Sequence, residues 1–92
     1  MPRMHCLVHG DVQGVGFRYF AQRSARNNNL LGWVRNVNDG TVESEVEGDA
    51  AALQSYLEDL QRGPAFAYVS RVDVSHEPGD GNYSDFHILP SS

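Results

Sequence analysis

Hydrophobic positions along the chain repeat first with the period of a strand and then with the period of a helix. Met4, Cys6 and Val8 occupy every second position of a segment that ends at Gly10, which is the pattern of a strand with one buried face. From Phe17 onward, apolar residues recur at intervals of three and four, which is the pattern of an amphipathic helix. We therefore predict a strand followed by a helix at the N-terminal end.

The rest of the chain shows the same two periods, interrupted by glycine, proline, asparagine and aspartate. The asparagine run at 27–29 ends the first helix, because asparagine tolerates the left-handed conformation. Asp39-Gly40 predicts a type I′ hairpin turn, in which both central residues have positive φ. The further predicted elements are strands at 30–37, 41–47 and 69–75, a helix between an N-cap at Asp49 and a stop at Gly63-Pro64, and a short last strand at Phe86 and Ile88.

This order of elements predicts an α+β fold. Right-handed crossovers place both helices on one face of an antiparallel sheet, which gives a ferredoxin-like split β-α-β sandwich (βαββαβ) with a short C-terminal strand. A length of 92 residues predicts a single domain over 1–92. The fold hosts carriers, binding modules and enzymes alike, so it does not decide the function.

Composition and charge exclude several classes of function. The formal net charge is −5, which gives no electrostatic footprint for nucleic acid or an anionic membrane surface. Cys6 is the only cysteine, so no internal disulfide is possible, and it is expected to be a small core residue. With no signal peptide pattern and no apolar run near the ~20 residues of a membrane span, we expect a cytoplasmic protein.

The loop between the first strand and the first helix carries the strongest chemical signal. Glycines at 10, 14 and 16 free the backbone to turn its N–H groups toward one point, and the loop leads directly into a helix N-terminus. Such a loop suits phosphate, and Arg18 in the first helical turn could take two phosphate oxygens at once. The loop lacks the Gly-Lys-Ser/Thr of a Walker A motif, and Tyr19 replaces the third glycine of the dinucleotide fingerprint. Composition alone leaves open a merely structural turn with a surface arginine.

Two segments together resemble the signatures of the acylphosphatase family. They are Gly-Asp-Val-Gln-Gly-Val-Gly-Phe-Arg at 10–18 and Gly-Trp-Val-Arg-Asn at 32–36, and the resemblance covers essentially the whole chain. It implies a ferredoxin-like hydrolase that cleaves the carboxyl–phosphate bond of acyl phosphates without a metal or cofactor. The catalytic residues that it implies are Arg18 and Asn36, and the implied phosphate-binding residues are Gln13, Gly14, Val15, Gly16, Phe17 and Arg18.

The resemblance also implies a mechanism. A carboxylate leaves readily, so the barrier lies in positioning and in stabilising charge on the phosphoryl oxygens. Asn36 would orient the attacking water, with no covalent phosphoenzyme, although an asparagine near a strand end can also be a simple turn residue. A monomer is expected, with inorganic phosphate and sulfate as competing anions.

Alternatives remain at this point. The chain could be a non-catalytic ferredoxin-like module that binds an anion or metabolite, or resemble the domain at the front of larger carbamoyl-transfer proteins. A metal site is not expected, because His5 and His9 lie about 13 Å apart on one strand face at ~3.3 Å per residue. The row of Glu43, Glu45 and Glu47 is expected to be a solvated strand face.

Overall fold

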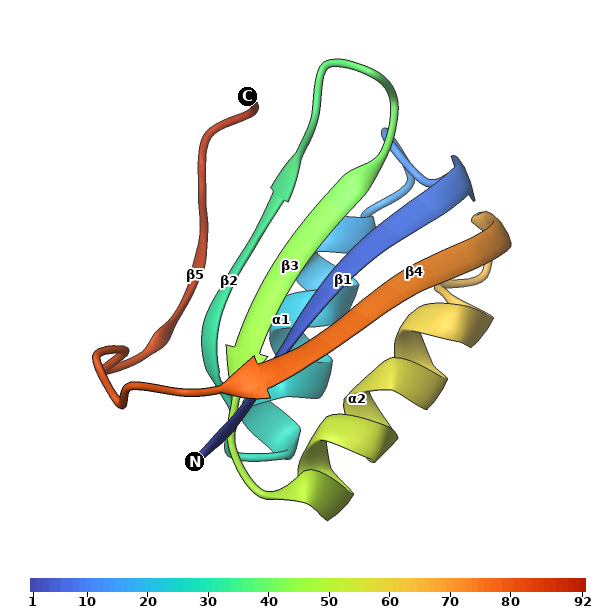
Figure 1. Ribbon diagram of the computed structural model, residues 1–92. Helices are drawn as coiled ribbons and strands as arrows, with labels where there is room; N and C mark the ends of the chain where they lie inside the picture. Colours follow the sequence, from blue (N-terminus) through green and yellow to red (C-terminus); the bar gives the residue numbers. More distant parts are fainter.

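The computed structural model describes all 92 residues and contains five strands and two helices (Figure 1). Their order confirms the predicted βαββαβ arrangement with a short last strand. The elements are β1 (Pro2–Asp11), α1 (Phe17–Asn27), β2 (Leu31–Asn36), β3 (Val42–Glu47), α2 (Ala50–Arg62), β4 (Tyr68–Pro78) and β5 (Phe86–Ile88). Neither helix is long and apolar enough to cross a membrane.

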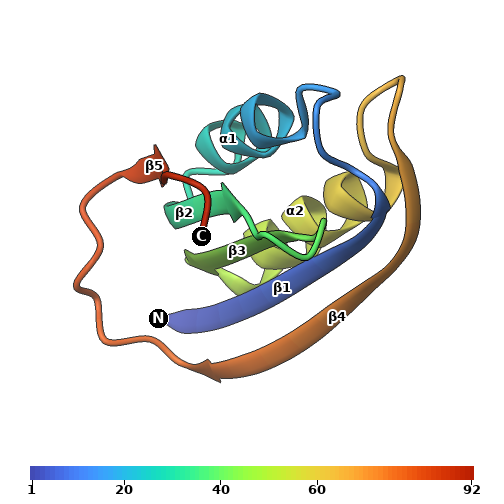
Figure 2. The same ribbon diagram turned by 90° about the horizontal axis from the view of Figure 1, so that it is seen from above.

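The five strands form one sheet in the order β4-β1-β3-β2-β5, and both helices cover the same face (Figure 2). The first four strands are antiparallel to their neighbours, as predicted, but β5 pairs in parallel with β2 through Gly32 and Phe86. The sheet is therefore mixed. The reason is the segment 79–85, which crosses one end of the sheet from β4 to the opposite edge, so that β5 starts beside the start of β2 (Figure 1).

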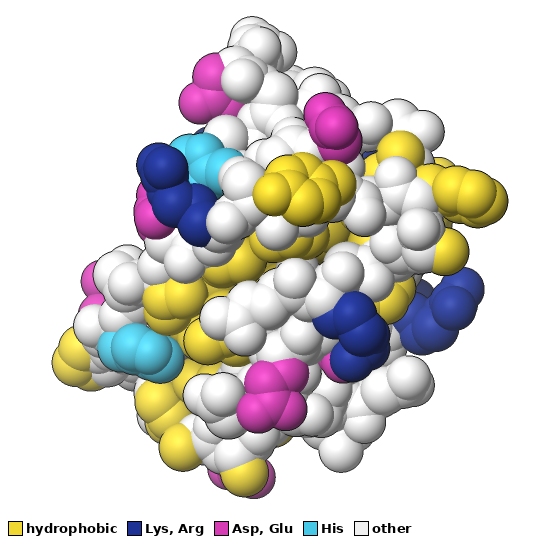
Figure 3. Space-filling view, turned by 90° about the vertical axis from the view of Figure 1, so that its right-hand side faces the viewer, with side chains coloured by type: hydrophobic (Ala, Val, Ile, Leu, Met, Phe, Trp, Pro, Cys, Tyr) yellow, Lys and Arg dark blue, Asp and Glu magenta, His cyan; other side chains and the backbone are white.

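The core lies between the sheet and the helices. The predicted alternation of β1 is confirmed, since Met4, Cys6 and Val8 are fully buried. Tyr56 of α2 is also fully buried, and its hydroxyl pairs with Ser44 Oγ of β3 at 2.7 Å. Half-buried valines of β4 border this core, and Figure 3 shows hydrophobic atoms on that side as a strip among polar and charged groups. The core thus covers one face of β1, the strand that pairs with both β3 and β4.

The β2–β3 hairpin differs from the predicted type I′ turn. Only Gly40 has a positive φ, of 96°, while Asp39 does not. Gly40 N–H donates to Val37 O at 3.0 Å and Val37 N–H donates to Thr41 O at 2.9 Å, which is a three-residue loop with glycine as its last residue. Asp39 closes this loop by accepting from the Thr41 backbone and hydroxyl, and these hydrogen bonds lower the pKa of Asp39.

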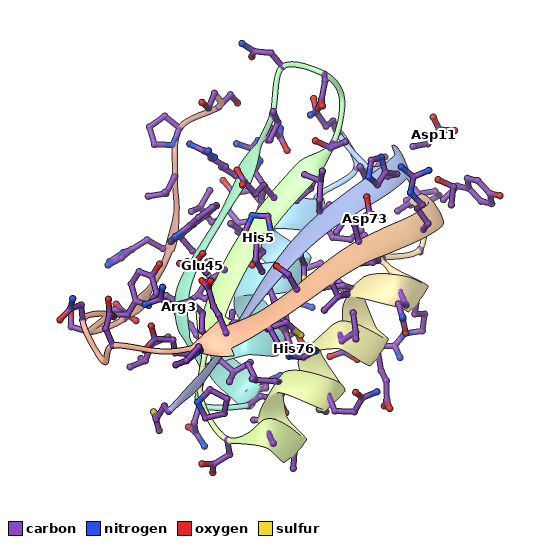
Figure 4. The ribbon with its side chains drawn as sticks, in the orientation of Figure 1. Arg3, His5, Asp11, Glu45, Asp73 and His76 are labelled. Carbon is purple, nitrogen blue, oxygen red and sulfur yellow. The ribbon has the colours of Figure 1, made fainter.

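The glutamate row of β3 is not uniformly solvated. Glu47 is 2% exposed, because Arg3 reaches it at 2.8 Å and the backbone N–H of Gly81 donates to it from the crossing segment. Arg3 lies among several carboxylates of the uncovered sheet face, including Glu45, beside which Figure 4 shows it. The predicted solvated face is wrong for Glu47, since segment 79–85 folds over it.

Farther along the same open face, Glu43 contacts two basic side chains. His5 Nε2 lies 2.7 Å from one carboxylate oxygen, and Arg35 donates to the other at 2.8 Å. Burial raises the pKa of Glu43, but the hydrogen bonds from His5 and Arg35 outweigh it, so the pKa lies below the usual 4.5. The charged form of Glu43 therefore favours the folded chain.

This shift predicts how acid affects stability. A carboxyl whose folded pKa is lowered contributes stability above its unfolded pKa and loses it as pH falls through the folded value. We expect the free energy of unfolding, measured by urea denaturation, to fall below about pH 4.5, and Glu43→Gln to lessen this fall. Glu58→Gln, at an exposed position of α2, is the control for removing one charge. Equal pH dependence in wild type and Glu43→Gln would show that the Glu43 contacts are not the cause.

Candidate active site

The connection from β1 to α1 presents a row of unpaired backbone donors. None of the amides at 13–16 donates to a backbone carbonyl, and the first helical bond is from Phe20 N–H to Gly16 O. The amides of Phe17, Arg18 and Tyr19 at the helix N-terminus therefore also lack intrahelical acceptors. Seven consecutive amides, 13–19, are thus available at the positive end of the helix dipole, which suits a tetrahedral anion.

Two glycines give this loop its shape. Gly14 and Gly16 have φ of 77° and 78°, in the left-handed region that other residues rarely adopt. A Cβ at either position would meet no atom within 4 Å, so backbone conformation, and not crowding, requires glycine there. Gly16 is also the N-cap residue of α1 and offers no side-chain oxygen to occupy the first amides. The helix N-terminus is thereby left open to a ligand.

The sheet brings Asn36 to the same end of the sheet as this loop. Strands β1 and β2 are both antiparallel to β3, so they run in the same direction and terminate at the same end of the sheet. Asn36 is the last residue of β2, and the loop follows the last residue of β1. The two ends are separated only by β3, a gap of about 10 Å at the usual strand spacing.

The side chain of Gln13 bridges that gap. Its Nε2 donates to Val37 O at 2.7 Å and to Thr41 O at 2.8 Å, both in the β2–β3 hairpin. Because Val37 follows Asn36, these bonds fix the loop against the strand end that carries Asn36. The sequence pointed to Gln13 only through its backbone amide, and no pattern in a single sequence identifies this long-range side-chain contact.

Asn36 carries an acceptor that no donor of the chain satisfies. Its Oδ1 is buried and has no hydrogen-bond partner, while its backbone oxygen accepts from Ser92 N–H at 3.0 Å. A buried acceptor without a donor costs about 1–3 kcal/mol, so such atoms generally serve a ligand or water. Oδ1 of Asn36 accordingly keeps an acceptor that no group of the chain uses.

Arg18 is the second residue of α1, is half-buried, and forms no ion pair or side-chain hydrogen bond. Four other arginines, by contrast, are each paired with carboxylates. The guanidinium of Arg18 therefore keeps its donors for a ligand, beside the unpaired amides of its own helix turn.

The other candidate side chains are used within the fold. Cys6 is fully buried, and this burial raises the pKa of its thiol to about 12, as suits a core residue. His5 pairs with Glu43, and His9 Nε2 lies 2.9 Å from Asp73. No three histidine, cysteine, aspartate or glutamate side chains are grouped so that they could hold a metal ion.

Comparison with known proteins identifies relatives along the whole chain. The profile of the family described as Acylphosphatase matches residues 4–88. An acylphosphatase of Moorella thermoacetica is 51% identical over 91 residues, covering 99% of this chain and 97% of that protein. An acylphosphatase of Geobacillus kaustophilus is 45% identical over 92 residues, covering 100% and 98% of the two chains.

Solved structures agree with the fold. The crystal structure of acylphosphatase from Bacillus subtilis superposes with a TM-score of 0.94 at 40% identity, covering 97% of this chain and 99% of that one. A crystal structure of HypF from T. kodakarensis gives 0.86 at 35% identity, where the match covers 100% of this chain and 12% of that one. The ferredoxin-like sandwich predicted from periodicity is confirmed, and the same unit also occurs inside a much larger protein.

The bridge made by Gln13 predicts a measurable effect on anion binding. We expect Gln13→Ala to weaken the affinity for inorganic phosphate roughly fivefold, because two hydrogen bonds that hold the loop are lost. The measurement is a phosphate titration followed through the amide NMR signals of residues 13–19. Gln61→Ala, at an exposed position of α2, is the matched control and should leave the affinity unchanged. Wild-type affinity in Gln13→Ala would show that the hairpin contacts do not shape the loop.

Proposed function

This chain belongs to the acylphosphatase family, and on that premise we propose how its own residues hydrolyse an acyl phosphate. Water attacks phosphorus directly, with Arg18 and Asn36 as the catalytic residues, and the products are a carboxylate and inorganic phosphate. The observation that carries this proposal is the buried Asn36 Oδ1 without a donor, at the same sheet edge as a free arginine and a row of unpaired amides.

The phosphoryl group is held by backbone and arginine donors. The backbone amides of Gln13, Gly14, Val15, Gly16 and Phe17 surround its oxygens, and the forked guanidinium of Arg18 takes two of them. These donors are fixed before substrate arrives, so they stabilise charge on the oxygens without reorganisation in the transition state. Local donors are needed because the net charge of −5 repels an anionic substrate.

Asn36 acts on the water. Its Oδ1 accepts one hydrogen bond and so orients the nucleophile toward phosphorus. An amide cannot take the proton, which passes to a phosphoryl oxygen of the substrate or to solvent. The leaving carboxylate is stable without a general acid, so no further side chain is needed for its departure.

We also propose that the protein works as a cytoplasmic monomer. A single, buried cysteine suits a reducing compartment. Arg18, Asn36 and the loop amides all come from one chain, so the site needs no second copy.

Inorganic phosphate and sulfate are expected to inhibit competitively, because the loop recognises a tetrahedral anion and not the acyl group. Added salt should weaken this inhibition modestly, since ionic screening is limited at a partly enclosed site. Steady-state kinetics with benzoyl phosphate at several phosphate concentrations measure the inhibition pattern. Noncompetitive inhibition, with no shift of the amide signals at 13–17, would remove the loop from the mechanism.

Substitution should separate the roles of the two catalytic residues. Arg18→Ala should weaken phosphate and substrate binding and also slow turnover, at a cost of about 3 kcal/mol, or roughly a hundredfold. Arg18→Lys should rescue only in part, because a point charge does not fork across two oxygens. Asn36→Ala should bind phosphate almost normally while its turnover collapses, since its contact acts chiefly in the transition state.

The measurements are phosphate titration and steady-state kinetics in the presence of a chelator, with folding checked by circular dichroism. Arg71→Ala and Asn38→Ala, at exposed positions, are the matched controls. If Asn36→Ala loses phosphate affinity as severely as Arg18→Ala, then Asn36 is a ligand of the anion and not of the water. Phosphate binding by a wild-type protein that hydrolyses no acyl phosphate would instead identify a non-catalytic binding module.

A further inference from the structure

The outer edge of β2 is paired well beyond β5. Strand β5 has only three residues, yet hydrogen bonding to the outer edge of β2 continues after it, where Leu89 N–H donates to Val34 O at 2.9 Å. The chain that follows β5, drawn in red, runs on beside β2 toward the β2–β3 hairpin (Figure 1). The segment 89–92 therefore extends the sheet along the strand whose last residue is Asn36.

Within this segment, Ser92 binds the backbone at Asn36 and again two residues beyond it. Ser92 N–H donates to Asn36 O at 3.0 Å, and Ser92 O accepts from Asn38 N–H at 2.7 Å. On the inner side of the strand, Asn36 pairs with Val42 of β3. The backbone of Asn36 is thus held between β3 on one side and Ser92 on the other.

These backbone contacts matter because of what the side chain of Asn36 lacks. Its Oδ1 is buried and has no hydrogen-bond partner, so no donor of the chain fixes the direction of this atom. A group that acts on a reacting molecule must be held within about 0.5 Å and 10–20° of its working geometry. The direction of Oδ1 therefore depends on how firmly the backbone of Asn36 is held.

We propose that Ser92 is a positioning residue, which holds the Asn36 backbone so that Oδ1 points at the attacking water. It acts through its backbone N–H and C=O and touches neither the substrate nor the water. This inference rests on the proposed function, because it takes Asn36 as the residue that orients the water. A contact that merely stabilised the fold would not act on turnover through Asn36.

The first test removes the N–H of Ser92. Proline at this position lacks the donor that Asn36 O accepts, whereas alanine keeps it. Ser92→Pro should lower kcat for benzoyl phosphate about fivefold, the size expected for one hydrogen bond. The affinity for inorganic phosphate should stay at the wild-type value, because Arg18 and the loop amides are unchanged. Ser92→Ala, the matched control, should behave as wild type. An equal loss of kcat and of phosphate affinity in Ser92→Pro would overturn the positioning role.

A second variant removes the other hydrogen bond from the hairpin side. Asn38 is the second residue of the turn that Gly40 N–H closes on Val37 O, a position that favours proline. Asn38→Pro therefore fits the turn and loses the N–H that Ser92 O accepts, so kcat should fall while phosphate affinity is kept. Asn38→Ala keeps the N–H and is the control. Wild-type kcat in either proline variant would contradict the proposal.

A double variant separates positioning from stability. In Asn36→Ala the atom to be positioned is absent, so adding Ser92→Pro should leave the residual turnover unchanged. A further fivefold loss in that background would assign Ser92 a structural role only.

The NMR signals of the Asn36 side-chain amide give a readout that does not depend on catalysis. They should shift in Ser92→Pro and stay in place in Ser92→Ala. Such a shift in a protein whose wild type hydrolyses no acyl phosphate would support the positioning by Ser92 and contradict the hydrolytic mechanism. Turnover by the wild type, with neither a shift nor a loss of kcat in Ser92→Pro, would do the reverse.

Discussion

The unpaired amides of the β1–α1 loop are the feature on which the rest of the site depends. None of these N–H groups has a backbone acceptor in the chain, and most of the loop is exposed, so an anion can accept from several of them without breaking a hydrogen bond of the fold. The left-handed conformations of Gly14 and Gly16 produce this alignment, and the N-cap glycine leaves the helix N-terminus unblocked. The loop is thus shaped to bind a tetrahedral anion.

The sheet holds the loop in place from both sides. Strand β1 lies between β3 and β4, so its end is fixed by two neighbours before the chain turns. Gln13 then attaches the loop to the β2–β3 hairpin, 24 and 28 residues away in sequence. Because β1 and β2 end at the same edge, a donor row and the acceptor of Asn36 approach from opposite sides of β3. In the proposed mechanism, the donor row holds the phosphoryl oxygens and Asn36 orients the water.

Sequence patterns correctly predicted the elements that depend on neighbouring residues in the chain. The alternation of β1 and the helical period of α1 follow from one buried face each, and Asn29, with φ of 57°, ends α1 as the asparagine run suggested. Two of the failures involve distant partners. Glu47 is buried by Gly81, 34 residues away, and β5 is parallel because segment 79–85 crosses the sheet end. The hairpin type failed for a local reason, since the Asp39 carboxylate caps Thr41 and keeps a negative φ.

Charge placement explains how an acidic chain can still attract an anion. Carboxylates are concentrated on the open sheet face, where Arg3, Arg35 and Arg71 neutralise part of them. Helix α1 lies on the opposite face of the sheet, without acidic residues (Figure 2). Asp11 is the nearest acid in sequence to the loop, and it is exposed, at the outer end of β1 (Figure 4). Asp39 lies in the hairpin that Gln13 contacts, but its carboxylate accepts hydrogen bonds from the backbone and hydroxyl of Thr41. The unpaired amides, the positive end of α1 and the unpaired Arg18 are therefore the local groups that favour an anion at the loop.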